Sequence, residues 1–140
     1  MAAGLVPEGH EIAVLQHLVD DIRRHQNHIT TGDIGFHYLV QALSAGKRSD
    51  VLFDILSRTD APSYGYQLSR GATTLTEAWD ANPLVSQNHF MLGHAEEWLY
   101  RGLAGIGFDM SAKDPDRIRI EPQFVTGVDS ASASYRSFIG

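Results

Sequence analysis

The sequence contains no cysteine, which removes disulfide frameworks, thiolate metal sites and cysteine nucleophiles at once. This absence fits a reducing compartment, so localisation stays open with the cytoplasm slightly favoured. Basic residues are also few, because 11 Lys and Arg stand against 17 Asp and Glu, for a formal net charge of −6. They are scattered along the chain. Nucleic acids and anionic membranes require a basic face, so we expect neither as a partner.

Other patterns are missing as well. No apolar run approaches the ~18 residues that cross a bilayer, and the N-terminal M-A-A-G-L-V-P-E-G-H lacks the features of a signal peptide. No Gly-rich phosphate loop or strained Ser elbow occurs. The histidines do not combine into a set with metal-ligand spacing. We therefore expect neither a cofactor nor a metal.

What the sequence does have is helical periodicity over most of its length. Four helices are predicted, each from an apolar stripe and a start or stop signal. The first begins at Pro7 and carries Ile12, Leu15, Leu18, Val19 and Ile22. The second carries Phe36, Leu39, Val40 and Leu43 and stops at Gly46. The third is capped by Ser49 and carries Val51, Leu52, Ile55 and Leu56. The fourth is capped by Ser86 and carries Phe90, Met91, Ala95, Trp98, Leu99 and Leu103.

The pattern changes near the C-terminus. Residues 117–122 alternate between apolar and charged side chains with period two, and Ser130–Tyr135 alternates small polar with apolar residues. Strand material is therefore predicted from about residue 115. The chain reads as mainly α, a layer or toroid of helix pairs followed by a short β segment.

The stretch G-A-T-T-L-T-E-A-W-D, Gly71–Asp80, allows two interpretations of Glu77. Thr74 and Glu77 have the spacing of a capping box, in which the Thr hydroxyl and the Glu carboxylate satisfy the first amides of a helix. In that case Trp79 belongs to the core. Alternatively, a Glu beside a Trp could be the base that deprotonates a water in glycoside hydrolysis. Spacing alone favours the cap.

Aromatic and polar residues gather in the loops around this stretch. Tyr64, Tyr66, Trp79 and His89 all lie in or beside polar connections. Sugars are bound by aromatic rings, which cover C–H faces, and by carboxylates and His, which bind hydroxyls. This mixture of residues is typical of a sugar site, and spacing does not decide between the two interpretations of Glu77.

The chain also resembles a known family along most of its length. The matching motifs are G-L-V-P-E (Gly4–Glu8), H-I-T-T-G (His28–Gly32), R-S-D (Arg48–Asp50), P-S-Y-G-Y (Pro62–Tyr66), Gly71–Asp80, S-Q-N-H-F (Ser86–Phe90), E-W-L-Y-R-G-L-A-G-I (Glu97–Ile106) and I-R-I-E-P-Q (Ile118–Gln123). In this order they resemble the C-terminal part of the catalytic domain of bacterial α-L-rhamnosidases, glycoside hydrolase family 78. The resemblance implies part of an (α/α)6 toroid in residues 1–107 and the start of a β-sandwich in residues 108–140.

The resemblance also implies roles for individual residues. The family pattern of a Thr-Thr pair, two residues, Glu, one residue and Trp places the general base on Glu77 and the aromatic on Trp79. Its Asn-His pair falls on Asn88 and His89, and His89 is expected to touch sugar hydroxyls. The substrate implied is an L-rhamnose-containing glycoside or that of a related deoxy-sugar.

This chain departs from the family pattern at two positions. Many members have Trp before the Glu, where this chain has Thr76, and a hydrophobic residue after T-T-G, where this chain has Asp33. Inversion at the anomeric carbon also needs a general acid, and the acidic motif that carries it in the family has no counterpart here. Asp33 is the one in-chain candidate for a second carboxylate near the pocket.

We therefore expect these 140 residues to be part of a longer catalytic domain, with Met1 internal to it, and to have little activity alone. Exposed helix faces are expected to promote self-association. Two alternatives remain open. One is a carbohydrate-binding module without catalysis, and the other is a structural helical domain in which Glu77 caps a helix and Trp79 is fully buried.

Overall fold

The structure is a computed structural model that describes residues 4–109, 111–113 and 117–136. Most of its regular structure is helical, as predicted. In chain order the elements are α1 (Glu11–Arg24), α2 (Asp33–Ala45), α3 (Ser49–Leu56), α4 (Tyr64–Ser69), the single turn η1 (Phe90–Leu92), α5 (Ala95–Trp98), η2 (Leu99–Leu103), β1 (Ile106–Phe108) and β2 (Ile118–Ile120).

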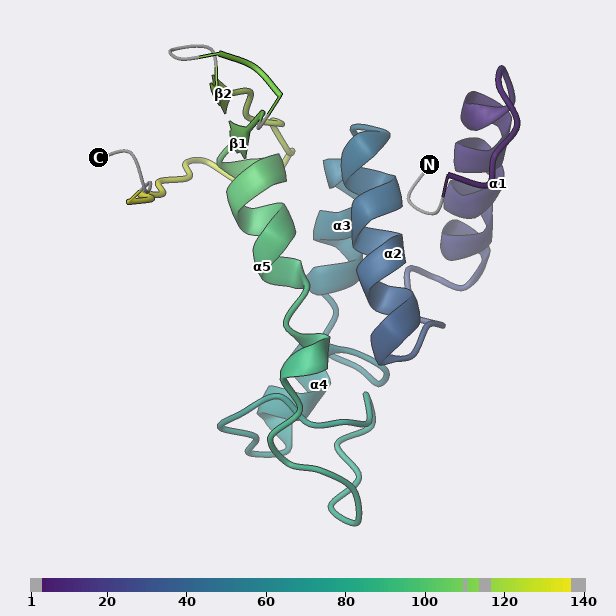
Figure 1. Cartoon of the computed structure of the whole chain (residues 1–140). Helices are drawn as coiled ribbons and strands as arrows, with labels where there is room; N and C mark the ends of the chain where they lie inside the picture. The colour runs from purple at the N-terminus through teal and green to yellow at the C-terminus, as the bar shows by residue number, and fades with distance from the viewer. Residues whose placement is uncertain (1–3, 110, 114–116, 137–140) are drawn as a thin grey trace.

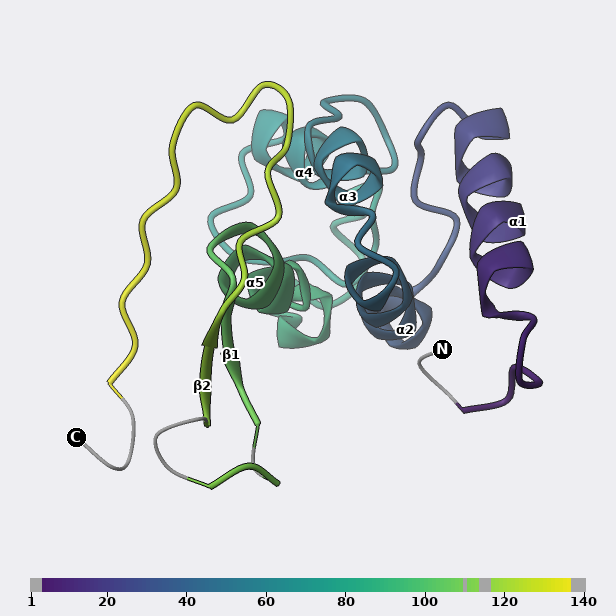
Figure 2. The same ribbon diagram turned by 90° about the horizontal axis from the view of Figure 1, so that it is seen from above.

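The core forms where α2 and α3 pack together and against α5 (Figures 1 and 2). The apolar stripe predicted for α2 is confirmed, because all four of its members are buried: Phe36, Leu39, Val40 and Leu43. Val51, Leu52 and Ile55 of α3 face it and are almost fully excluded from solvent. Burial of each such side chain stabilises the fold by about 1.5–3 kcal/mol.

Helix α1 lies on the outer side of α2 (Figure 2). It begins at Glu11, so the prediction of a helix start at Pro7 was wrong. The carbonyl of Pro7 instead closes a turn by accepting from the amide of His10 at 3.1 Å. Val19 and Ile22 are buried, but Ile12 at the N-terminal end is 84% exposed.

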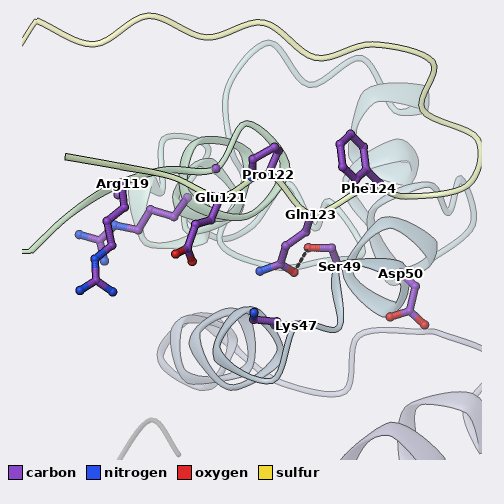
Figure 3. Close-up of a pocket in the computed structure, with 11 residues that line it drawn as sticks. Lys47, Ser49, Asp50, Arg119, Glu121, Pro122, Gln123 and Phe124 are labelled. Atoms are coloured by element: carbon purple, nitrogen blue, oxygen red, sulfur yellow. Dashed lines mark hydrogen bonds between the residues drawn. The ribbon is translucent and has the colours of Figure 1, made fainter. Parts of the chain in front are cut away.

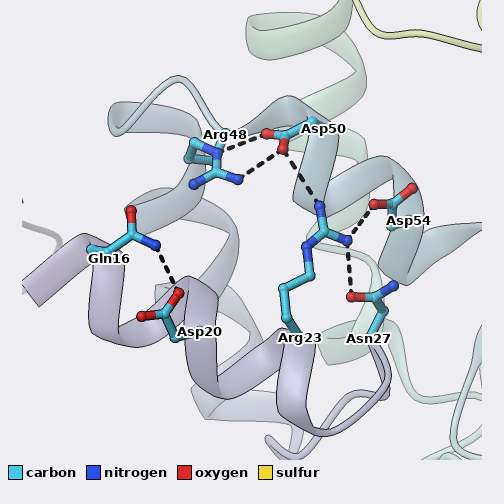
Figure 4. Close-up of polar contacts among 7 residues, drawn as sticks. All are labelled: Gln16, Asp20, Arg23, Asn27, Arg48, Asp50 and Asp54. Carbon is cyan, nitrogen blue, oxygen red and sulfur yellow. Dashed lines mark hydrogen bonds and ion pairs between the residues drawn. The ribbon is translucent and has the colours of Figure 1, made fainter.

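Charged side chains connect α1 to α3 (Figure 4). Arg23 donates to Asp54 and approaches Asp50 at 3.5 Å. Arg48 holds the same Asp50 carboxylate at 2.8 Å. The C-terminal half of α1 is therefore attached both by buried apolar side chains and by this ion-pair network.

The turn between α2 and α3 confirms one predicted signal and corrects another. Gly46 follows the last residue of α2 as predicted, and it lies against α1, because a Cβ there would meet Leu15 Cδ2 at 2.5 Å and the leucine side chain would have to shift. Ser49, however, does not cap α3, because Arg48 takes the N-cap position. The hydroxyl of Ser49 accepts from Trp98 Nε1 at 2.8 Å and donates to Gln123 Oε1 at 2.6 Å.

The fourth predicted helix is shorter than expected. Ser86 caps no helix, and η1, a single turn, precedes α5. Helix α5 continues into η2, whose last turn widens so that the amide of Ala104 donates to the carbonyl of Leu99. Phe90 is 83% exposed, whereas Trp98 is buried.

Strands β1 and β2 pair antiparallel, with Ile106 opposite Ile120. The alternating pattern at 117–122 therefore did predict a strand, whereas β1 was not predicted. Gly105 enters the hairpin at φ +74°, and a Cβ there would lie 2.2 Å from Pro122 N. Residues 130–135 form no strand, so that prediction was wrong. Part of the predicted β segment, residues 110, 114–116 and 137–140, lies outside the described residues.

The hairpin and the long connection after α4 lie at opposite ends of the molecule (Figure 1). Beyond β2 the chain runs back toward α3, where Gly127 lies close to the ring of Phe53. Within the described ranges no helix combines the length and hydropathy needed to span a bilayer. The predicted boundary between residues 107 and 108 falls inside β1, and it stays a prediction.

Candidate functional site

Two limbs of the connection after α4, residues 74–77 and 86–89, run beside each other. The amide of Glu77 donates to the carbonyl of Ser86 at 2.9 Å, and the amide of His89 donates to the carbonyl of Leu75 at 2.7 Å. The hydroxyl of Thr74 donates to the carbonyl of Gln87. These bonds place Glu77 and His89 on neighbouring limbs of one loop.

Glu77 is exposed and caps no helix, because none begins at residues 74–77. The capping-box interpretation is therefore wrong. One carboxylate oxygen, Oε2, accepts from the amide of Ser86 at 3.1 Å. In the part of the chain that the structure describes, Oε1 has no hydrogen-bond partner. The side chain is thus fixed on one side and open to water on the other.

An aromatic cluster lies beneath the loop. Trp79 contacts Phe36 and Tyr64 edge-on, with ring centroids 5.2 and 4.9 Å apart. Its Nε1 donates to the carbonyl of Thr31 at 2.8 Å, and only 9% of the residue is exposed. The indole therefore anchors the loop to the connection between α1 and α2. This is the burial that the structural-domain alternative predicts for Trp79.

The two tyrosines proposed for the site differ in their surroundings. Tyr64 is partly buried, its hydroxyl donates to the carbonyl of Leu92, and burial raises the pKa of its phenol. It also lines a cavity of ≈ 460 Å³ with residues 72–75. Tyr66 is half-buried in the first turn of α4, where its amide donates to the capping hydroxyl of Ser63 at 3.0 Å.

Asn88 is exposed on the second limb, next to His89 in the sequence. The hydroxyl of Ser86 lies 3.4 Å from the amide of Asn88 and accepts from it. Thr76, which takes the place of a family Trp, is turned inward and buried. Its hydroxyl donates to the carbonyl of Ala78 at 2.8 Å, so this side chain forms no wall of an open pocket.

Asp33, the first residue of α2, meets His89 across the site. Asp33 Oδ2 lies 3.1 Å from His89 Nε2. This hydrogen bond, aided by the amide of Ile34, lowers the pKa of the Asp33 carboxyl. A general acid must hold its proton near neutral pH, which requires a raised pKa. The shift therefore argues against Asp33 as the missing acid.

Sequence reasoning missed a second group of titratable side chains between α2 and α5. The rings of His37 and His94 lie 4.5 Å apart, and His37 Nδ1 is 4.0 Å from Glu97 Oε2. Burial, and next the nearby His37, lower the pKa of His94. The available signal was that His94 and Glu97 are three residues apart at the start of α5, but the contribution of His37 from α2 could not be read from it.

The structure also has a cavity that the sequence did not indicate, lined by residues from segments before and after the loop. Its volume is ≈ 540 Å³, and it lies between the turn after α2, the start of α3 and the segment that follows β2 (Figure 3). Lys47, Arg119 and Glu121 line it, together with the Ser49–Gln123 hydrogen bond. Over residues 4–109, 111–113 and 117–136, no group of three His, Asp or Glu is placed to hold a metal ion.

Comparisons with known proteins give one consistent result. The family model described as the bacterial alpha-L-rhamnosidase 6 hairpin glycosidase domain matches residues 1–103. An alpha-L-rhamnosidase of Streptomyces avermitilis is 30% identical over 149 residues, which cover 100% of this chain and 14% of that protein. One from Formosa agariphila is 30% identical over 115 residues, covering 76% of this chain and 12% of that protein.

Solved structures agree. The S. avermitilis alpha-L-rhamnosidase complexed with L-rhamnose superposes with a TM-score of 0.74 at 30% identity, over 89% of this chain and 13% of that one. The structure of the alpha-L-rhamnosidase from Dictyoglumus thermophilum superposes with a TM-score of 0.66 at 34% identity, over 75% of this chain and 12% of that one. The chain thus spans 12–14% of the length of these relatives.

Proposed function

This chain belongs to the six-hairpin glycosidase domain family of bacterial α-L-rhamnosidases, and on that premise we propose that it carries the general base and part of the sugar pocket of an inverting glycosidase. The predicted family and fold class, a mainly helical part of a six-hairpin domain with a short β segment, are confirmed. The proposed substrate is an L-rhamnose-containing glycoside or that of a related deoxy-sugar.

The observation that carries the proposal is the placement of Glu77. One of its oxygens is held by the amide of Ser86, while the other is open to solvent. A general base for hydrolysis needs this combination, because it must be fixed relative to the sugar and still contact the attacking water. The water would add to the anomeric carbon from the face opposite the leaving group, which inverts the configuration.

The other residues take supporting roles in this proposal. His89 and Asn88 share the loop with Glu77 and would contact sugar hydroxyls, with Tyr66 at the edge. Trp79 and Tyr64 would shape the pocket from below, since Trp79 is buried and Tyr64 is packed against it. The loop would owe its position to this aromatic support.

The isolated chain should lack the second half of the chemistry. An inverting enzyme needs a general acid about 6.5–9.5 Å from the base, across the sugar ring. The family's acidic motif matches no segment of this sequence, and the hydrogen-bonded Asp33 is poorly suited to replace it. We therefore expect no hydrolysis of ordinary rhamnosides by this chain alone.

A substrate whose leaving group needs no acid separates the two halves of the reaction. Fluoride departs from α-L-rhamnosyl fluoride without protonation, so its hydrolysis requires only the base. We expect the chain to hydrolyse this fluoride slowly and Glu77→Gln to lower the rate by about 10²–10⁴-fold. Glu96→Gln, at an exposed helical position, is the matched control and should leave the rate unchanged. Equal rates for wild type and Glu77→Gln would refute Glu77 as the base.

The burial of Trp79 favours one competing function, a structural helical domain without a ligand. Titration with L-rhamnose, monitored by NMR, distinguishes this structural alternative from a domain that binds sugar. The structural alternative expects no binding, whereas a binding module expects binding without any turnover of the fluoride that depends on Glu77.

A further inference from the structure

Asp33 and His89 form a contact between parts of the chain that are 56 residues apart. Asp33 opens α2 directly after the T-T-G motif, at the position where the family resemblance leads one to expect a hydrophobic side chain. Both side chains are partly shielded, with 34% and 20% of their surfaces exposed. A carboxylate therefore meets the imidazole at the edge of the candidate site.

Both partners are held independently of their contact. Asp33 Oδ1 accepts from the amide of Ile34 at 2.8 Å, which orients the carboxylate at the start of α2. The amide of His89 donates to the carbonyl of Leu75 at 2.7 Å, which fixes the backbone beneath the ring. The distance of 3.1 Å between Oδ2 and Nε2 thus joins two positions that the fold has already set.

This contact determines the tautomer of the neutral imidazole. An ionised carboxylate only accepts hydrogen bonds, so the nitrogen that faces it must carry the proton. In a neutral ring the other nitrogen is then unprotonated and becomes an acceptor. His89 Nδ1 has no hydrogen-bond partner among the described residues. It is also absent from the fully buried polar atoms that lack a partner, so it can accept a hydrogen bond from a ligand.

We propose that Asp33 is a positioning residue that locks His89 in the Nε2–H tautomer, so that Nδ1 is presented as a hydrogen-bond acceptor. The second part of this inference rests on the proposed function: His89 Nδ1 accepts a hydrogen bond from one sugar hydroxyl. Asp33 itself touches no substrate.

Long-range ¹H–¹⁵N NMR of the histidine side chains at pH 8 tests the tautomer, because protonated and unprotonated ring nitrogens give distinct ¹⁵N signals. In the wild-type chain we expect His89 Nε2 to resonate as a protonated nitrogen and Nδ1 as an unprotonated one. In Asp33→Ala the two signals should move toward each other as the tautomers mix.

Two further variants control this measurement. Asp33→Ser keeps a short polar side chain at the start of α2 but cannot reach the ring. It should therefore show the same mixing of tautomers as Asp33→Ala, and it replaces that variant if Asp33→Ala folds poorly. Asp60→Ala removes the carboxylate 3.0 Å from His28 Nε2. It should change the signals of His28 and leave those of His89 unchanged. A His89 pattern that is unchanged in both Asp33 variants would overturn the proposal.

Binding of L-rhamnose connects the tautomer to function. Asp33→Ala should weaken binding by about 3- to 10-fold, as the loss of one properly presented acceptor would. The same change should have no effect in a His89→Ala background, because Asp33 acts only through His89. If the wild-type chain binds no rhamnose while the tautomer responds as expected, the proposed function fails and the tautomer lock stands. An equal effect of Asp33→Ala in both backgrounds would refute the link to sugar binding.

Discussion

Ser49 joins three parts of the chain through one hydroxyl group. It accepts from the indole of Trp98 on α5 and donates to the side chain of Gln123 after β2, while its own backbone starts α3. Gln123 also donates to the carbonyl of Ser44 at 3.3 Å. Buried polar groups of this kind stabilise the fold only while every member has a partner. The hydroxyl of Ser49 should therefore contribute more to the stability of the fold than its small size suggests.

Replacing Ser49 by Ala should lower the free energy of unfolding by about 1–3 kcal/mol, because the buried indole N–H loses its acceptor. Urea denaturation followed by tryptophan fluorescence measures this change. Ser57→Ala, at an exposed position just after α3, is the control and should change stability by less than about 0.5 kcal/mol. If the two variants have the same midpoint, the hydrogen-bond relay does not stabilise the fold.

At the scale of single residues, local patterns failed where the partner lay far away in the sequence. Ser49 precedes a helix and was predicted as its cap, yet its partner Gln123 lies 74 residues further on. Thr74 and Glu77 matched a capping box, but no helix follows them. Both bond instead to the limb at residues 86–89. Spacing identified Glu77 as a residue of interest and could not reveal what it contacts.

Helices α2 and α5 meet through a group of ionisable side chains. His37 comes from α2, His94 from the residue before α5 and Glu97 from within it. Asp33, at the start of α2, also acts on His94. Burial and the nearby His37 lower the pKa of His94, while Glu97 and Asp33 oppose this shift. The packing of these two helices is therefore linked to pH.

The sign of that linkage follows from the lowered pKa. As pH falls below about 6.5, the unfolded chain binds a proton at His94 that the folded chain does not yet accept, so stability decreases. Above about pH 6.5, His94 binds no proton in either state, so it does not change the free energy of unfolding. Urea midpoints measured between pH 5 and 8 should therefore fall on the acid side, and less so in His94→Gln. His17→Gln, at an exposed position on α1, is the control. Parallel profiles for wild type and His94→Gln would contradict the linkage.

At the scale of elements, the sequence predicted helices better than it predicted their ends. The stripes of α2 and α3 were correct because burial on one face imposes a period of 3.6 residues. Helix starts were placed wrongly at Pro7 and Ser86, where turn formers resemble caps. Strand β1 was missed because I-G-F is too short to show alternation. Residues 130–135 alternate as a strand would, but they have no neighbouring strand to pair with among the described residues, so they form none.

The molecule as a whole exposes apolar side chains on several helices. Ile12 on α1, Ile34 and Tyr38 on α2 and Leu99 after α5 are 84%, 63%, 48% and 45% exposed. The chain belongs to a six-hairpin domain family, and it spans only 12–14% of the length of its relatives. Such faces favour association when nothing covers them.

We expect the isolated chain to associate with itself at increasing concentration. Light scattering over a range of concentrations should show a rising apparent mass. Replacing Ile12 and Tyr38 together by Lys should reduce it, whereas Leu84→Asp, on the loop, should not. A compact monomer that melts cooperatively at every concentration would contradict the prediction.

The attachment of α1 has a consequence for the solvent around the molecule. Arg23, Asp50 and Asp54, which join α1 to α3, keep 37%, 50% and 41% of their side-chain surfaces exposed. Dissolved ions screen exposed charges over about 8–10 Å at ordinary ionic strength. Added salt should therefore loosen the first helix while the apolar contacts of α2 and α3 persist, which makes ionic strength a means of controlling one edge of the molecule independently of its centre.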